Sequence, residues 1–148
     1  LYSSAASDVY KRQTYKHYTA GSQGTVYVGG NPSPEIMKTY NVMAEMYIRT
    51  KEAMKSGVPI GTVWETASRV YRAAYGVDYY RILGPQQGAA AFIGRVGRGV
   101  KDPLKSGASY LVQPQVNDPL LISVAATVMA TDDGPEEITK PLLELVTV

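Results

Sequence analysis

The sequence predicts an α+β domain in which two long helices cover one face of a mostly antiparallel β-sheet. Three features of the chain support this prediction: a β-type segment comes first, two strongly periodic helical segments follow, and several short β-type segments separated by glycine complete the chain. The 148 residues correspond to about one domain. A content of 45% hydrophobic and 19% charged residues is typical of a globular protein.

The first thirteen residues are expected to lie outside the native domain. They show neither a period of 2 nor a period of 3.6, and they lack the basic-then-apolar layout of a signal peptide. They also resemble a translated sequencing adapter of the kind found at the ends of metagenomic gene fragments. We therefore expect residues 1–13 to be non-native, with a short native arm as the alternative, and residues 14–148 to be the C-terminal part of a longer domain.

Strands and helices are predicted in turn over the first half of the chain. Residues 14–28 are rich in Tyr, Thr and Val but contain two glycines, which favours two short strands or one bulged hairpin. Residues 34–56 and 62–76 each carry apolar residues at steps of three and four, which predicts two amphipathic helices. Ser33, followed by proline, is the expected N-cap of the first helix. For the second helix, Thr62 and the glutamate three residues later predict a capping box.

The second half of the chain predicts short strands joined by turns. Residues 84–99 carry five glycines and are expected to form a loop with one or two short strands. Further strands are predicted over residues 108–116 and 120–130, and the second of these ends at an Asp-Asp-Gly turn. Residues 142–148 alternate weakly and end the chain.

Composition excludes several classes of function. There is no cysteine, so thiolate metal sites, thiol catalysis and disulfide scaffolds are excluded. No apolar run approaches the ~20 residues of a membrane span, so we expect no membrane partner. Fifteen basic and thirteen acidic residues give a net charge of +2, which is too small for a nucleic-acid-binding surface. His17 is the single histidine and the one candidate general base of the imidazole type.

Four segments carry motifs in a recognisable order. Residues 15–25 contain Tyr-x-x-Tyr-x-Ala, and residues 55–63 contain a Gly-Val-Pro link between the two helices. Residues 104–114 contain Leu-x-x-Gly and end in Gln-Pro, and residues 129–139 contain Thr-Asp-Asp-Gly-Pro-Glu. Together they resemble the pita-bread family, which includes creatinase, Xaa-Pro aminopeptidases of the prolidase type and methionine aminopeptidases. The resemblance covers residues 14–148 and implies an N-terminally truncated pita-bread fold.

The resemblance also implies which positions correspond to the family's metal ligands. The peptidases hold two divalent metal ions with two aspartates, one histidine and two glutamates. The second aspartate corresponds to Gly21, the histidine to Gln87, one glutamate to Gln113 and the other to a position near Ala125. The first aspartate would lie before residue 14.

These substitutions argue against a metal centre. Hard divalent cations need anionic oxygen ligands, and glycine and alanine offer no side-chain donor. Residues 14–31 and 120–131 contain no aspartate or glutamate, so a shift of the alignment by one residue supplies no ligand. We therefore expect no metal, no other cofactor and no two-metal hydrolysis.

Two functions fit this pattern. The first is a degenerate peptidase-family domain, a pseudoenzyme that acts in binding or scaffolding, in which His17, Tyr18, Gln87 and Gln113 are candidates for lining a small-molecule or peptide pocket. The alternative is a metal-free hydrolase of creatinase type that acts on a small amidino or amino acid, with His17 as general base. For the glutamines, the simpler interpretation is that they satisfy buried backbone groups. For His17, it is a half-exposed position in a strand.

Three basic residues of the glycine-rich segment are interpreted as a solvated rim, because their spacing matches no phosphate-binding pattern; they are Arg95, Arg98 and Lys101.

By resemblance to the family, we also expect a homodimer and an upstream N-terminal domain. A cytoplasmic location is expected.

Overall fold

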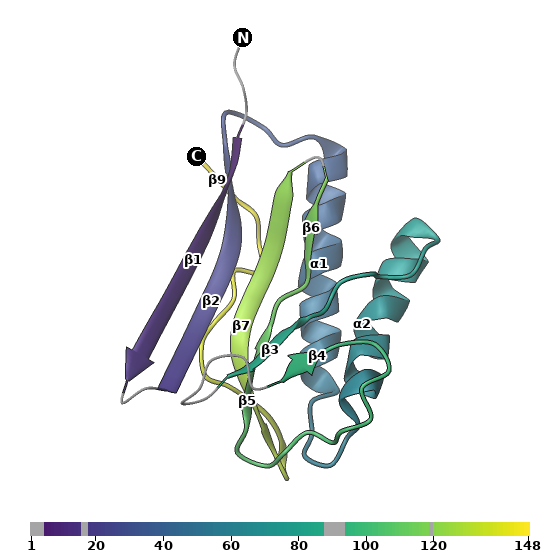
Figure 1. The fold of residues 1–148 in the computed structure, drawn as a ribbon. Helices are drawn as coiled ribbons and strands as arrows, with labels where there is room; N and C mark the ends of the chain where they lie inside the picture. The colour runs from purple at the N-terminus through teal and green to yellow at the C-terminus, as the bar shows by residue number, and fades with distance from the viewer. Residues whose placement is uncertain (1–4, 16–17, 88–93, 119) are drawn as a thin grey trace.

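The structure is a computed structural model, and it describes residues 5–15, 18–87, 94–118 and 120–148 (Figure 1). For residues 5–10, 15 and 18 it describes the backbone alone. The elements of this part of the chain are β1 (Ala5–Tyr15), β2 (Tyr18–Val28), α1 (Pro34–Glu52), α2 (Ile60–Tyr75), β3 (Gly84–Gln87), β4 (Arg95–Val96), β5 (Ser109–Val112), β6 (Gln115–Asn117), β7 (Leu121–Thr131), β8 (Gly134–Glu137) and β9 (Val146–Thr147).

A single sheet holds these strands, and β7 lies at its centre. The main order is β1-β2-β7-β5-β3-β4, while β6 and β8 add to β7 and β9 pairs with the end of β2. The pairings are antiparallel except for that between β2 and β9. The predicted α+β class, with an antiparallel sheet and helices on one face, is confirmed.

The two helices pack on one face of the sheet and form the core with it (Figure 1). Tyr40 and Met43 of α1 and Val63 of α2 are completely buried there, together with Val124 and Val128 of β7. Burial of each such side chain contributes about 1.5–3 kcal/mol, so this layer is the main source of stability. In the described part of the chain, no helix has both the length and the apolar character needed to cross a bilayer.

The helix ends agree with the sequence except at two points. Ser33 Oγ accepts the N–H of Ile36 at 3.3 Å, which confirms the predicted N-cap of α1. This helix ends at Glu52, one turn before the predicted residue 56. α2 begins earlier than predicted, so Thr62 lies inside its first turn and the predicted capping box is wrong. The first two amides of α2 donate instead to the backbone carbonyls of residues 102 and 100, at 2.9 and 2.8 Å, so they need no side-chain cap.

Strand β1 departs from the expectation that residues 1–13 stand outside the fold. It pairs with β2 along its whole length, from Ala5 opposite Val28 to Tyr15 opposite Tyr18. An edge strand is held by backbone hydrogen bonds on one side and needs no strict alternation of apolar residues, and residues 11–14 are exposed. The non-native origin of residues 1–13 stays a prediction.

Two other strands differ from their predicted form. β2 runs through Gly21 and Gly24 without a break. Gly24 leaves the space that Leu142 fills, since a Cβ at this position would lie 2.9 Å from the Leu142 Cβ. The strand predicted over residues 108–116 is divided into β5 and β6 at Gln113 and Pro114, because proline has no N–H to donate to the ladder.

Glu137 of β8 ties the sheet to α1. Its Oε1 accepts hydrogen bonds from the Tyr47 hydroxyl at 2.8 Å and from Lys51 Nζ at 3.3 Å. Burial alone would raise the pKa of Glu137, but the hydrogen bonds from Tyr47 and Lys51 favour the carboxylate, and the net effect is a lowered pKa.

We expect Tyr47→Phe to reduce both the stability of the protein and its dependence on acid pH. A carboxyl with a lowered folded pKa stabilises the fold above its unfolded pKa of about 4.3, and this stability is lost as the pH falls through the folded pKa. Because a hydrogen bond to a charged group contributes about 1.5–3 kcal/mol, urea denaturation at pH 7 should show a loss of about that size, and the loss should shrink below pH 4. Glu136→Gln, on the exposed neighbouring side chain, is the control. A loss in Tyr47→Phe that is equal at pH 7 and pH 3.5 would contradict the assignment.

Candidate functional site

The face of the sheet that points away from the helices is polar and enclosed. Side chains alternate along β7, and its even-numbered residues join the helix core. Ser123, Ala125 and Thr127 therefore point to the opposite face, yet they are 0%, 0% and 1% exposed. β2 also approaches β3 and β5, with which it does not pair, so the sheet is curved here.

Glutamine side chains meet on this face on either side of Ala125. Gln23 of β2 lies directly opposite Ala125, and Gln113 lies in the link between β5 and β6 on the other edge of β7. Gln113 Nε2 donates to Gln23 Oε1, and it also donates to Gln115 Oε1 at 3.3 Å. The methyl group of Ala125 leaves the space in which the two amides meet.

Thr127 holds the other half of the polar group together. Its Oγ1 accepts the N–H of Gly21 at 2.9 Å, and it lies 3.0 Å from the Gly21 carbonyl oxygen and 2.9 Å from Gln87 Oε1. A hydroxyl has one hydrogen, so Thr127 donates to one of these two oxygens at a time. Thr139 Oγ1 accepts the Thr127 N–H and donates to the Gly21 carbonyl, both at 2.8 Å. We call Gln23, Gln87, Gln113, Gln115, Thr127 and Thr139 the amide–hydroxyl cluster.

The positions predicted from the sequence are thus brought together through residues that no motif marked. Gly21 and Gln87 meet through Thr127, while Gln113 reaches the strand position opposite Ala125 through Gln23. A signal for Thr127 was present, because it is a polar residue inside the apolar run of β7. His17 lies outside the described residues, and so does the side chain of Tyr18, which begins β2.

The amide–hydroxyl cluster does not fit a divalent metal ion. The described residues include no group of three or more His, Cys, Asp or Glu side chains that could hold one. The cluster is uncharged, the amide oxygens of Gln23 and Gln87 already accept hydrogen bonds, and Gln113 presents its nitrogen to the centre. Hard cations need anionic oxygen ligands, so this part of the chain provides no ligand set for a metal-bound nucleophile.

A pocket of about 520 Å³ borders the amide–hydroxyl cluster and shares Gln113 and Gln115 with it. The other lining residues are Ile82, Gly84, Pro85, Gly94 and Arg95. Gly84 has φ 136°, and a Cβ at this position would overlap the carbonyl oxygen of Leu111. Glycine is therefore required for β3 to come this close to β5. Arg95 is exposed, and among the described lining residues it is the one that carries a charge.

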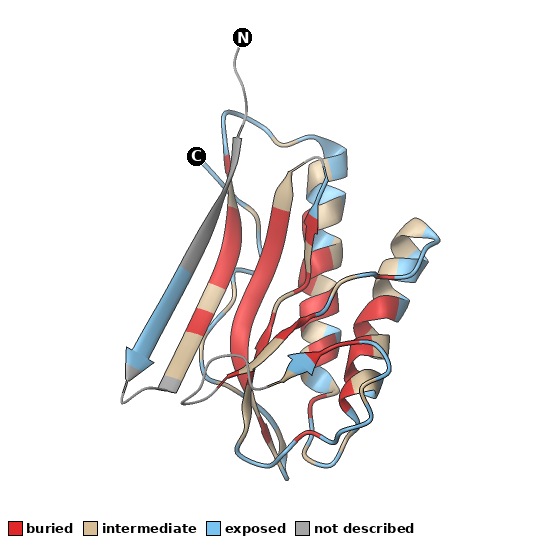
Figure 2. Cartoon of the chain, in the orientation of Figure 1, coloured by how far each residue is buried: buried red, intermediate tan, exposed pale blue. Residues whose placement is uncertain are grey.

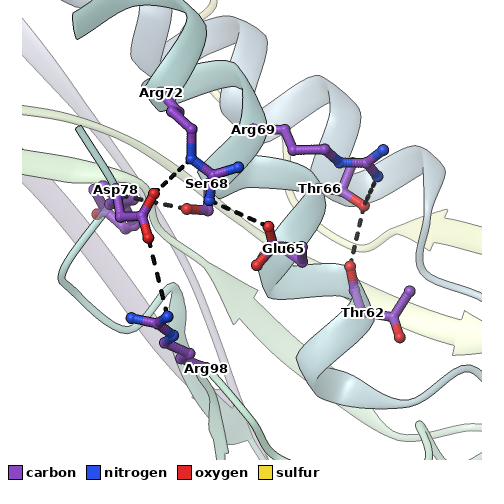
Figure 3. Close-up of polar contacts among 9 residues, drawn as sticks. Thr62, Glu65, Thr66, Ser68, Arg69, Arg72, Asp78 and Arg98 are labelled. Atoms are coloured by element: carbon purple, nitrogen blue, oxygen red, sulfur yellow. Dashed lines mark hydrogen bonds and ion pairs between the residues drawn. The ribbon is translucent and has the colours of Figure 1, made fainter. Parts of the chain in front are cut away.

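A second polar group lies on the exposed side of α2, where Arg72 is its centre (Figure 3). Arg72 Nε lies 2.5 Å from Asp78 Oδ1 and its NH2 nitrogen lies 3.4 Å from Glu65 Oε1, while Arg98 reaches the other oxygen of Asp78 at 4.0 Å. The hydrogen bond from Arg72 lowers the pKa of the Asp78 carboxyl. These side chains are between 43% and 74% exposed, so water and salt screen the pairs. These ion pairs link the loop after α2 to the helix. Arg98 is solvated, as predicted.

Comparison with protein families gives one match, with residues 13–131, to the model described as metallopeptidase family M24. The similar solved structures include dipeptidase PepE from Mycobacterium ulcerans, with a TM-score of 0.86, and X-Pro aminopeptidase from Thermotoga maritima, with a TM-score of 0.85. Each is 22% identical in sequence, and the matches cover 95% of this chain and 39% and 40% of the two solved chains.

The N-terminal domain of FACT complex subunit SPT16 from chickpea (Cicer arietinum) is also similar. Its TM-score is 0.77 at 16% identity, and the match covers 95% of this chain and 37% of that one. At such identities the likeness establishes the fold, and this chain spans about two fifths of the solved chains. A comparison with curated proteins gave no match.

We expect Thr127→Val to destabilise the protein by about 1–3 kcal/mol. Valine keeps the shape of the side chain but removes the hydroxyl, so the buried amide of Gly21 loses its partner. Urea denaturation followed by circular dichroism measures the loss. Thr62→Val, at an exposed position on α2, is the matched control and should change stability by no more than about 0.5 kcal/mol. An equally small effect in both variants would show that the Thr127 hydroxyl does not hold the cluster together.

Proposed function

We propose that this chain, which belongs to metallopeptidase family M24, is a degenerate domain of the family that binds a ligand instead of hydrolysing peptides. The chain has the pita-bread fold of the family's peptidases. In the proposal, Gly21, Gln87, Gln113 and Ala125 stand at the positions of the family's metal ligands.

The amide–hydroxyl cluster carries this proposal. Hydrolysis by two metal ions needs cations that generate a hydroxide and stabilise the leaving group. Two divalent cations in a buried site need anionic ligands to compensate their charge, whereas Gln113 and Gln87 are neutral and form hydrogen bonds with Gln23 and Thr127. Neutral amides next to a pocket are well suited to bind a ligand through hydrogen bonds, and Gln113 belongs to both the cluster and the pocket.

A neighbour in fold supports a binding or scaffolding role. The N-terminal domain of SPT16, a subunit of the FACT complex, has this fold. A domain of this architecture therefore occurs in a protein that is part of an assembly. We propose by the same family analogy that the natural protein forms a homodimer, and the cytoplasmic location stays a prediction.

The proposal predicts that the full-length protein has no metal-dependent peptidase activity. The protein should be incubated with a panel of Xaa-Pro dipeptides and amidino acids, once with Mn²⁺ and once with EDTA. Equilibrium dialysis should measure bound Mn²⁺ in parallel. We expect no hydrolysis in either condition and less than about 0.1 Mn²⁺ per chain, because the described residues offer no anionic ligand set to compensate the cation.

An active X-Pro aminopeptidase serves as the positive control under the same conditions. Hydrolysis of dipeptides that EDTA abolishes would refute the proposal. If the protein instead turns over an amidino acid at the same rate with and without EDTA, the proposed binding function is replaced by the creatinase-type alternative. His17 is then the first residue to substitute.

A further inference from the structure

We propose that the pocket beside Gln113 and Gln115 binds a carboxamide group, whether of a small amide or of a peptide. This inference rests on the proposed binding function and names the chemical class of the ligand. It follows from the hydrogen-bonding groups of the two glutamines that have no partner among the described residues.

Gln115 presents a hydrogen-bond donor to the pocket. Its Oε1 accepts from Gln113 Nε2 at 3.3 Å, while its Nε2 has no partner among the described residues. The Tyr79 hydroxyl holds the backbone on both sides, since it donates to the Gln115 carbonyl and accepts the Gln115 N–H, both at 3.0 Å. The free amide nitrogen therefore extends from a fixed backbone.

Gln113 presents the complementary acceptor. Its Nε2 carries two hydrogens, and both are used, one toward Gln23 and one toward Gln115. Its Oε1 receives no hydrogen bond from any residue that the structure describes. Its backbone N–H donates to the carbonyl of Leu83 at 2.5 Å, so this side chain too starts from an anchored position.

The hydroxyl of Ser123 is a second, independent sign of missing partners at this end of the polar face. Ser123 pairs with Gln115 across β6 and β7, and it is completely buried. Its Oγ is the one buried side-chain oxygen or nitrogen in the described part of the chain without a hydrogen bond. Buried polar groups are normally satisfied, so Ser123, although it does not itself line the pocket, marks this end of the polar face as incompletely paired.

A carboxamide satisfies the two glutamines at once. Its carbonyl accepts from Gln115 Nε2 and its N–H donates to Gln113 Oε1, while its hydrocarbon part contacts the apolar side chains of Ile82 and Pro85, which also line the pocket. A carboxylate has no hydrogen to give to Gln113 and would turn a negative charge toward its oxygen. An alkylammonium has no acceptor for Gln115. Arg95 is exposed, so water screens its attraction for an anion.

The test compares three probes of one shape on the full chain: 3-methylbutanamide, 3-methylbutanoate and 3-methylbutylamine. Each is titrated into ¹⁵N-labelled protein, and the shifts of the glutamine side-chain NH₂ signals give the affinity. We expect the amide to bind at least tenfold more tightly than the acid and the amine. N-acetyl-leucinamide is a fourth probe, which distinguishes a peptide ligand from a small amide. If it binds more tightly than 3-methylbutanamide, the pocket is assigned to peptides. If it binds equally or more weakly, the pocket is assigned to small amides.

Gln115→Leu should weaken binding of the amide at least tenfold. Gln115→Glu keeps the size of the side chain, replaces the donor by an acceptor and should cause the same loss, so the test survives if one variant does not fold. Gln86→Leu, on β3 and outside this pocket, is the matched control and should bind like the natural protein.

Tighter binding of the carboxylate than of the amide, or unchanged affinity in both Gln115 variants, would overturn the inference. The absence of amide binding in a protein that takes up no Mn²⁺ and cleaves no dipeptide would refute this inference alone. Dipeptide hydrolysis that depends on Mn²⁺ would refute the proposed function itself.

Discussion

Strand β7 is buried on both of its faces, and this double burial constrains the structure around it (Figure 2). One face packs against the helices and needs only apolar side chains. The other carries Ser123 and Thr127, whose polar groups need partners inside the protein because water does not reach them. The partners of Thr127 come from β2, from β3 and from the segment after β8. A single strand position thus joins residues more than a hundred positions apart in the chain.

The parts of the fold that depend on local signals could be predicted from the sequence. The Ser33 cap, the periodic faces of both helices and the left-handed Gly76 at the end of α2 are all determined within a few residues. The start of α2 could not be predicted in this way, because its first amides are satisfied by a loop forty residues later. β1 could not be predicted either, because an edge strand depends on the edge offered by its neighbour and needs little pattern of its own.

Only some residues of the candidate site could be predicted from the sequence. The motifs indicated Gly21, Gln87 and Gln113, since the resemblance to the family predicts that these positions correspond to charged residues of its pattern. Gln23 and Thr127 carry no such mark, because neither is a position at which chemistry was expected. Their role arises from strand register, which sets Gln23 opposite Ala125 and is determined by contacts across the whole sheet. The fold is shared with a dipeptidase, an aminopeptidase and an SPT16 domain, so what distinguishes this chain resides in the side chains that the sheet presents.

The way the glutamines meet beside Ala125 bears on how such a domain evolves. A lone carboxylate introduced at position 125, which is completely buried, would be enclosed beside the amides without a counter-charge, at a cost of several kcal/mol, until further charged neighbours had also appeared. Such a first step toward a charged centre therefore gives a less stable protein. In a pita-bread domain whose centre is held by neutral hydrogen bonds, selection for stability alone therefore opposes the introduction of single charged residues.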